Sequence, residues 1–292
     1  MKVLTVITTT YNRSSCLDRL YESLLEQECH DFIWLVVDDG STDDTKNKIK
    51  EWQDNNLVEI EYVYKENGGM HTARNLGYSL VHTELNTIID SDDWMAPNAV
   101  HDIIEYWKAN KENSYAGMIT LNRDPEGNII GTNLPENVKS CSYKDFWKKY
   151  QMRGDKKLVY RSELTKQFPY PEYVGEKFYP AATKFYMIDK SYDMLIADIT
   201  TCIVNYNDDS MTRDKYAQYK SCPRSFMDYR KEMINIDLGI KENAKNMIHY
   251  VMEMSIAKEK PSQDIIKNPL FYICYLPGKL TYLYIIKTKK KY

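Results

Sequence analysis

Several patterns that would place this 292-residue chain in other protein classes are missing from it. Its six cysteines have neither the paired spacing of a metal site nor a regular disulfide spacing, which favours free thiols in a reducing cytoplasm. No apolar run approaches the roughly 20 uninterrupted residues of a membrane-spanning helix. The apolar start of the chain is too short for a secretory signal, because the polar residues 8–12 interrupt it.

Strong net charge and phosphate-cradling glycine motifs are also missing. The net charge of −3 gives no reason to expect nucleic-acid binding. The chain has neither a Gly-x4-Gly-Lys-Ser/Thr run nor a Gly-x-Gly-x-x-Gly run, which disfavours kinases and dehydrogenases. A nucleotidyltransferase would carry a glycine-rich basic loop after its first strand, and residues 8–12 are not such a loop.

What the first hundred residues do contain is an alternation of β-branched runs and helical patterns. The strands are expected at residues 3–8, 33–37, 58–64 and 85–89. Strand–helix alternation predicts parallel pairing with right-handed crossovers. Beyond residue 110 the pattern is less regular. There we expect a strand at 115–121, a hairpin around 124–130, two short strands within 194–204, and helices after Pro223.

Polar clusters follow three of these strands, at residues 9–13, 38–41 and 90–93. In parallel α/β sheets, ligands bind at the carboxyl ends of the strands. The three clusters are therefore predicted to converge on one edge of the sheet.

The acidic cluster after the fourth strand is the most informative of the three. Side chains of an extended segment alternate between faces, so Asp90 and Asp92 point the same way. Magnesium is usually held by one or two carboxylates and by substrate phosphates. This pattern indicates a nucleotide-diphosphate substrate. The alternative is an ordinary polar turn, because Asp and Ser are common turn residues.

Four motifs together resemble those of a family 2 glycosyltransferase of the GT-A fold, of the type that builds bacterial cell-surface glycans. The motifs lie, in order, at residues 6–13, 36–43, 67–77 and 89–93. The resemblance is close over residues 3–110 and looser through Glu176 and the loop 209–213.

The resemblance implies a GT-A architecture in the α/β class. Its core would be a Rossmann-like, mostly parallel sheet flanked by helices, with a C-terminal helical extension. The nucleotide-sugar half would span residues 1–110, the acceptor half 111–220, and the helical region 221–292.

The resemblance also implies a set of nucleotide-binding residues. These are Thr9, Tyr11, Arg13, Asp38, Asp39, Gly69, Arg74, Asp90, Ser91 and Arg213. Thr9 and Tyr11 would flank the base, and Asp39 or its neighbour Asp38 would accept the ring N–H. Asp92 would bind Mg²⁺ or Mn²⁺, which bridges the diphosphate.

The remaining assignments carry alternatives. Gly69 would allow close backbone approach, Arg74 would reach the nucleotide, and Asp90 would hold the ribose or the metal's water shell. Arg213 would swing over the diphosphate, since arginine suits phosphate oxygens. Arg74 could instead be a surface helix residue, and Asp38 or Asp39 could cap the following helix.

Family relatives usually invert the anomeric centre with a carboxylate base in a Glu-Asp pair of the second half. Here the matching pair is Glu176 followed by Lys177, so the second acid is absent. We expect Glu176 to be the base, with Asp189 and Glu172 as weaker candidates. The alternative is a surface carboxylate paired with a neighbouring cation.

The last part of the chain combines an aromatic, apolar segment at residues 269–286 with a lysine cluster at 287–291. This combination favours docking on an anionic leaflet, and hence a cytoplasmic protein attached peripherally to the inner face of the cell membrane. Lys279 and a break at Pro277 argue against a span. The alternative is a final helix packed on the domain and followed by a solvated end.

These patterns predict an enzyme that moves a sugar from a nucleotide-diphosphate donor, expected to be a UDP-sugar, to a hydroxyl of a glycan or lipid-linked acceptor. A metal-dependent, inverting single displacement is expected. The alternative is a catalytically impaired nucleotide-sugar-binding or membrane scaffold protein, which the departure at Lys177 keeps open.

Overall fold

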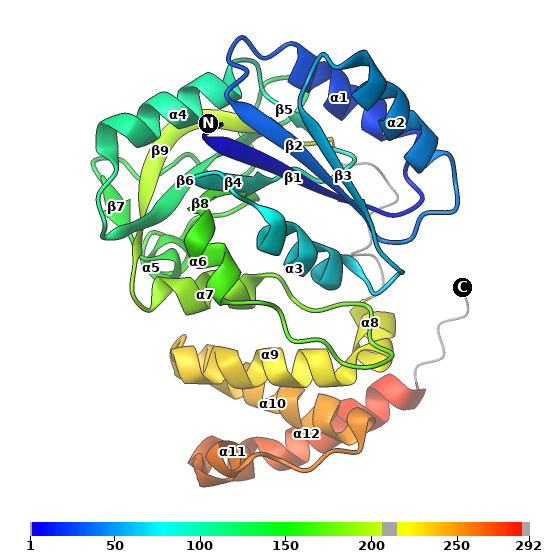
Figure 1. Cartoon of the computed structure of the whole chain (residues 1–292). Coiled ribbons are helices and arrows are strands. Elements are labelled where there is room, and N and C mark those ends of the chain that lie inside the picture. Colours follow the sequence, from blue (N-terminus) through cyan, green and yellow to red (C-terminus); the bar gives the residue numbers. More distant parts are fainter. Residues whose placement is uncertain (1, 206–214, 288–292) are drawn as a thin grey trace. The chain divides into compact units, whose positions relative to one another are not determined.

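Runs rich in Val, Ile and Thr form a nine-stranded sheet in the computed structural model, which describes residues 2–205 and 215–287 (Figure 1). The strands are β1 (Leu4–Thr10), β2 (Phe32–Asp38), β3 (Ile60–Tyr64), β4 (Leu85–Ile88), β5 (Trp94–Met95), β6 (Tyr115–Arg123), β7 (Ser140–Cys141), β8 (Lys156–Arg161) and β9 (Asp193–Ile203). Their order is β3-β2-β1-β4-β8-β6-β9-β5, with β7 paired to β9. The predicted α/β fold is confirmed.

The block β3-β2-β1-β4 is parallel throughout. Its register pairs Thr10 of β1 with Asp38 of β2, and Ile7 of β1 with Ile88 of β4. The carboxyl ends of β1, β2 and β4 therefore share one edge of the sheet. Strand β8 lies between β4 and β6 and is antiparallel to both, while β6 and β9 are parallel.

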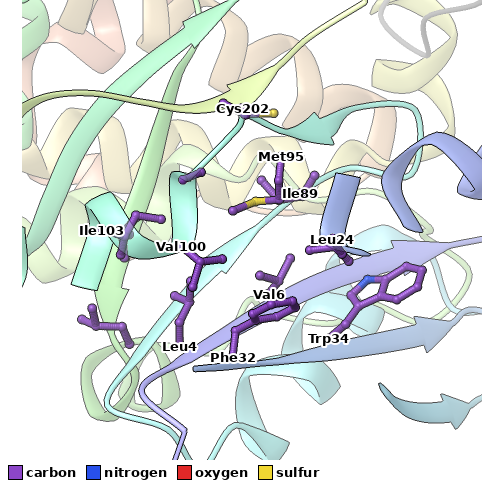
Figure 2. Close-up of a cluster of buried hydrophobic side chains, with 14 of the residues drawn as sticks. Leu4, Val6, Leu24, Phe32, Trp34, Ile89, Met95, Val100, Ile103 and Cys202 are labelled. Atoms are coloured by element: carbon purple, nitrogen blue, oxygen red, sulfur yellow. The ribbon is translucent and has the colours of Figure 1, made fainter. Parts of the chain in front are cut away.

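Helices cover both faces of this sheet. They are α1 (Leu17–Leu25), α2 (Thr45–Asn55), α3 (Met70–Leu80), α4 (Ala99–Asn110), α5 (Tyr143–Lys148), α6 (Ser162–Gln167) and α7 (Ala182–Asp189). Side chains of α1, α2 and α4 share one buried core with Leu4, Val6, Phe32 and Trp34 of β1 and β2 (Figure 2). On the opposite face Gly77 of α3 meets β1, where an added Cβ would lie 2.9 Å from Ile7 Cγ2.

The chain divides into two units. The first unit comprises residues 1–169 and 184–207, and the second comprises residues 170–183 and 208–292. The second unit contains α8 (Lys215–Ser221), α9 (Pro223–Ile236), α10 (Ile240–Ala257), α11 (Gln263–Lys267) and α12 (Pro269–Lys287). Its apolar core joins Met247 and Val251 of α10 to Phe271 and Cys274 of α12. The functional boundaries expected near residues 110 and 220 stay predictions.

Three local expectations were wrong. Residues 193–203 form the single strand β9 rather than two short strands, because register shifts against β6 absorb its irregularities. The sequence predicts that Ser14 and Ser15 cap the first helix, but helix α1 begins at Leu17 with Cys16 as its N-cap. Helix α12 continues through Pro277 and shows no break there. None of the helices in the described ranges combines the length and hydropathy that crossing a membrane requires.

Candidate functional site

The loops that follow β1 and β2 are tied together by Asn12. Its backbone N–H donates to Ser41 Oγ at 2.9 Å, and its Oδ1 accepts the backbone N–H of Thr42 at 2.8 Å. Asn12 holds a left-handed conformation with φ 52°, which asparagine tolerates better than most residues. One side chain thus fixes the first strand-end loop against the second.

Asp38 ends β2 and is fully buried. Its Oδ1 accepts the backbone N–H of Ser41 at 2.7 Å, and its Oδ2 accepts the hydroxyl of Tyr62 at 2.8 Å. Burial and the bond to Asp38 raise the pKa of Tyr62, so the hydroxyl stays protonated and remains a donor. Asp38 therefore holds the turn after β2.

Asp39 is buried and organises the loop between β3 and α3. Its Oδ1 accepts the Gly68 N–H at 3.0 Å and Lys65 Nζ at 2.6 Å. Its Oδ2 accepts the Gly69 N–H at 2.8 Å and Asn67 Nδ2 at 3.2 Å. A carboxylate offers about four acceptor positions, so these donors match its capacity. Gly69 begins α3 with φ 97°, a conformation that favours glycine.

The acids after β4 make a different kind of contact. Asp92 Oδ2 accepts Arg13 Nη1 at 2.9 Å, and Asp90 Oδ1 accepts Arg74 Nη2 at 2.9 Å. Arg13 comes from the loop after β1, and Arg74 comes from α3. The fourth-strand loop is thereby joined to the first, and the first is joined to the second by Asn12. The predicted convergence of the three polar clusters on one edge is confirmed.

Electrostatics distinguish the members of this acidic cluster. Desolvation by the surrounding protein raises the pKa of Asp90, although its side chain is 46% exposed, but Arg74, Lys157 and Arg13 outweigh that effect and leave the pKa below its ordinary value. Burial raises the pKa of Asp93 to about 7 despite the nearby Lys157. Asp90 is therefore ionised at neutral pH, whereas Asp93 titrates near neutral pH.

Two residues that contact the acidic cluster belong to none of the sequence motifs. Lys157 on β8 places its Nζ 3.8 Å from Asp93 Oδ2, and Cys202 on β9 places its Sγ 3.8 Å from the same oxygen. Burial raises the pKa of the Cys202 thiol to about 12, which keeps it neutral. Residues so distant in the chain meet only because β8 and β9 enter the same sheet, so the sequence pattern gave no means to find them.

The donor set beside Asp92 fits a hard divalent cation. Among the described residues the contact made by Asp92 is with Arg13 through Oδ2, and its side chain is 38% exposed. A hollow of about 390 Å³ opens next to it, lined also by Asp18, Arg19 and Glu22. The described part of the chain holds no group of three or more His, Cys, Asp or Glu side chains arranged as a metal cage. One carboxylate with room for phosphate oxygens is what Mg²⁺ commonly uses.

The other predicted site residues lie as follows. Thr9 is half-buried at the end of β1, Tyr11 is about half exposed in the loop after it, and Ser91 is buried between the two acids. These positions bring Thr9, Tyr11 and Ser91 to the same edge, and their roles stay predictions. Arg213 lies outside the described residues.

Glu176 belongs to the second unit and is buried. Its Oε1 accepts the backbone N–H of Arg224 at 2.9 Å, and its Oε2 accepts that of Ser225 at 2.8 Å. These are first-turn donors of α9, which lack partners inside the helix. Glu176 therefore satisfies the start of α9, and its catalytic role stays a prediction.

The weaker base candidate Asp189 is engaged in a similar way in the first unit. Its carboxylate accepts the backbone N–H groups of Tyr143 and Lys144, at the start of α5. Burial raises the pKa of Asp189, with these two N–H groups opposing the shift. Like Glu176, it holds a helix N-terminus.

Residues 5–165 match the model of the glycosyl transferase family 2. The chain belongs to this family. Chondroitin synthase of Escherichia coli is 33% identical to it over 137 residues, which is 46% of this chain and 20% of that protein.

Solved structures share the fold at lower identity. The structure of S. aureus TarS residues 1–349 with UDP-GlcNAc has a TM-score of 0.61 at 18% identity, covering 98% of this chain and 82% of that 1–349 chain. A mannosyltransferase of Pyrobaculum calidifontis with GDP-Man and Mn²⁺ has a TM-score of 0.56 at 15% identity, covering 96% and 87%. The family 2 chain described here spans between about a seventh and a third of the length of the curated relatives it matches.

Proposed function

We propose that this family 2 chain transfers a sugar from a UDP-sugar to a hydroxyl of a glycan or lipid-linked acceptor. The observation that carries the proposal is the pairing of Asp90 with Arg74 and of Asp92 with Arg13 at the carboxyl edge of the sheet. Both carboxylates are paired with arginines, and each arginine could leave its carboxylate to bind phosphate oxygens instead. The relatives' own donors and products are consistent with this substrate class.

In this proposal the arginines change partners when donor binds. Arg13 and Arg74 pair with carboxylates in the free chain, and guanidinium groups also suit phosphate oxygens geometrically. Transfer of either arginine to the diphosphate would release Asp92 or Asp90 for a new contact. Asp92 would then hold the divalent cation, which neutralises charge on the leaving diphosphate.

The nucleoside would be held at the neighbouring loops. Asp39, with Thr9 and Tyr11 beside it, is the proposed site for the base. Four donors already match the acceptor capacity of Asp39, so an N–H of the base would replace one of the two side-chain donors, Lys65 or Asn67. The backbone N–H groups of Gly68 and Gly69 would keep the carboxylate in place. Gly69 would let the backbone come close to the ligand, since it carries no side chain.

An inverting single displacement needs a base on the acceptor side. Glu176 remains the proposed base. Each of its oxygens accepts one N–H and retains a second lone pair, so the capping contacts leave acceptor capacity. If Glu176 carries no catalytic role, the alternative of a catalytically impaired, nucleotide-sugar-binding scaffold gains support from Lys177.

The decisive experiment measures donor binding and transfer together. The purified chain is screened by thermal shift against UDP-sugars and GDP-mannose, with and without Mn²⁺, because a ligand that binds the native state raises its melting temperature. We expect a UDP-sugar with Mn²⁺ to give the largest shift, and UDP release when acceptor glycan is added. A chain that gains no stability from any nucleotide sugar would contradict the proposal.

A matched pair of variants tests whether donor and metal bind at the acidic rim, the loop after β4 that carries Asp90 and Asp92. Asp92→Asn removes the charge next to Arg13, whereas Asp54→Asn removes a charge from an exposed ion pair on α2. We expect the first variant to lose the Mn²⁺-dependent part of the shift and the second to keep it. Equal shifts in both variants would remove Asp92 from the metal site.

A further inference from the structure

Helix α12 has two apolar faces, and the second unit buries one of them. Phe271, Cys274, Gly278 and Ile285 are buried. Three of these face α10, where the approach is close enough that a Cβ at Gly278 would lie 2.5 Å from Val251 Cβ. This contact fixes which side of α12 faces α10, and Figure 1 shows the two helices side by side.

The opposite side of α12 is also apolar and faces outward. Leu276 is 66% exposed, Leu280 58% and Leu283 47%. At 3.6 residues per turn these positions fall about half a turn away from the buried set. Further exposed apolar side chains extend the same surface: Tyr272, Ile273, Tyr275, Tyr284 and Ile286. Single exposed apolar residues are normal, but a continuous row of this size marks an interaction surface.

The charge around this outer face is of one sign. Residues 269–292 contain five lysines and no acidic residue, in a chain whose net charge is −3. Lys279 and Lys287 lie on α12 itself, and the other three follow it in the sequence. Lys279 Nζ lies 5.5 Å from the ring centroid of Tyr275 and 5.9 Å from that of Tyr282. Cations therefore accompany the apolar row.

These features together fit an anionic lipid surface. Tyrosine is enriched where a bilayer meets water, because its ring is apolar and its hydroxyl is polar. Lysines next to an apolar helix face are attracted to anionic headgroups. Because one face of α12 packs against α10, only its outer face can meet lipid, so the helix would lie in the plane of the interface.

We propose that the outer face of α12 docks on an anionic membrane surface. Leu276, Leu280 and Leu283 enter the boundary between headgroups and acyl chains, while the lysines meet the headgroups. The inner face stays on α10, so docking needs no rearrangement of the second unit. This proposal does not rest on the proposed function, because no residue of the acidic rim takes part.

The test is flotation of the full chain with lipid vesicles. Vesicles of phosphatidylcholine alone are compared with vesicles that also contain phosphatidylglycerol. We expect binding to the anionic vesicles that weakens as salt is added, and little binding to the neutral ones. Equal recovery with both vesicle types, or none with either, would overturn the proposal.

Replacing the apolar row tests its contribution. Leu276→Ser, Leu280→Ser and Leu283→Ser are combined, and binding to anionic vesicles should weaken by roughly tenfold or more. The matched control combines Val174→Ser and Ile240→Ser, which remove exposed apolar side chains elsewhere in the second unit. The control should bind like the parent. Circular dichroism melting shows that both variants are folded.

The lysines provide a second arm, which leaves the three leucines unchanged. Replacing Lys287, Lys289, Lys290 and Lys291 by glutamine should weaken binding roughly fivefold per lysine and flatten its salt dependence. Unchanged binding would overturn the lysine assignment.

Self-association is the competing use of the same face. A leucine-dependent dimer seen by light scattering, without vesicle binding, would overturn the proposal. Asp92→Asn should bind vesicles like the parent, which separates this test from the test of sugar transfer.

Discussion

Two acidic loops at the same sheet edge are built in opposite ways. After β2, Asp38 and Asp39 are buried, and each accepts at least one backbone N–H of a neighbouring turn. The side chains of Tyr62, Lys65 and Asn67 supply their other donors. After β4, Asp90 and Asp92 each meet one arginine, and their side chains are 46% and 38% exposed. The first pair shapes the loops, whereas the second pair keeps capacity for a ligand.

The difference shows why identical residue types need not share a role. Backbone N–H donors cannot leave a carboxylate without unfolding a turn. An arginine side chain can, because it rotates about several bonds and donates to phosphate oxygens as readily as to carboxylate oxygens. Exposure and donor type, rather than the presence of aspartate, separate scaffold acids from candidate ligand-binding acids.

The largest expected effect is on the fourth-strand acids. Asp92→Asn should lower the rate of sugar transfer roughly thousandfold, because the proposed cation neutralises the leaving diphosphate. Its free energy of unfolding should change by less than about 1 kcal/mol, since the pair with Arg13 is partly exposed. Steady-state transfer assays and urea unfolding measure the two effects. If Asp92→Asn lost as much free energy of unfolding as the Asp39→Ala variant described next, the two loops would not differ in their structural roles.

For the acids after β2, we expect the main effect of a substitution to be on stability. Asp39→Ala leaves the N–H groups of Gly68 and Gly69 without their acceptor. The free energy of unfolding should fall by about 3 kcal/mol, the order expected for losing several hydrogen bonds to a buried charge. Urea unfolding followed by tryptophan fluorescence checks this. A change below about 1 kcal/mol would show that the loop does not depend on Asp39.

Glu253 extends the comparison to a buried acid in the second unit. It is fully buried on α10, Arg230 Nε lies 3.5 Å away, and burial raises the pKa of Glu253 to about 8. The folded chain therefore holds this proton more tightly than the unfolded chain, whose glutamate has a pKa near 4.5. Its contribution to stability is fully present below about pH 4.5 and is lost as the pH rises toward 8.

Glu253→Gln should remove that part of the pH dependence. We expect the variant to gain on the order of 4 kcal/mol over the parent at pH 9, relative to their difference at pH 5. Urea unfolding at both pH values measures the difference. A parent chain that is more stable at pH 9 than the variant would show that the ion pair with Arg230 outweighs burial.

The smallest expected effect concerns Glu176, which resembles Asp39 in its use of backbone donors. Glu176→Gln should lower the free energy of unfolding by about 1 kcal/mol, because one capping acceptor of α9 becomes a donor. A base role adds a loss of transfer rate of roughly a hundredfold or more. Full transfer activity in a folded Glu176→Gln chain would leave this residue with its capping role alone.

Local patterns were sufficient to predict the parallel block of the sheet. Residues 17–25 carry their apolar stripe at the helical period. Strands β1 and β2 are short runs rich in β-branched residues, and β2 is apolar up to its last residue, Asp38. Strand β9 was harder, because its register shifts against β6 depend on the partner strand. The continuity of α12 through Pro277 depends on packing against α10, which a local pattern does not contain.

The site was predictable to the extent that its residues lie in the loops after strands. The convergence of Arg13, Asp39 and Asp92 could be predicted because each follows the carboxyl end of a predicted parallel strand. Lys157 and Cys202 could not be found in this way, since β8 and β9 reach the acidic cluster from far along the chain. The capping contacts of Asp189 and Glu176 were also out of reach, because they depend on which helix begins beside each carboxylate.

Asn12 has a consequence for how a nucleotide would be received. Its bonds to Ser41 and Thr42 lock two loops into one rigid body before any ligand arrives. A preformed cradle loses little conformational entropy on binding, so more of the contact energy is available as affinity. Adaptation to different donors would then depend on the side chains of Arg13 and Arg74. Asn12→Ala should slow nucleotide binding while leaving those arginines free to move.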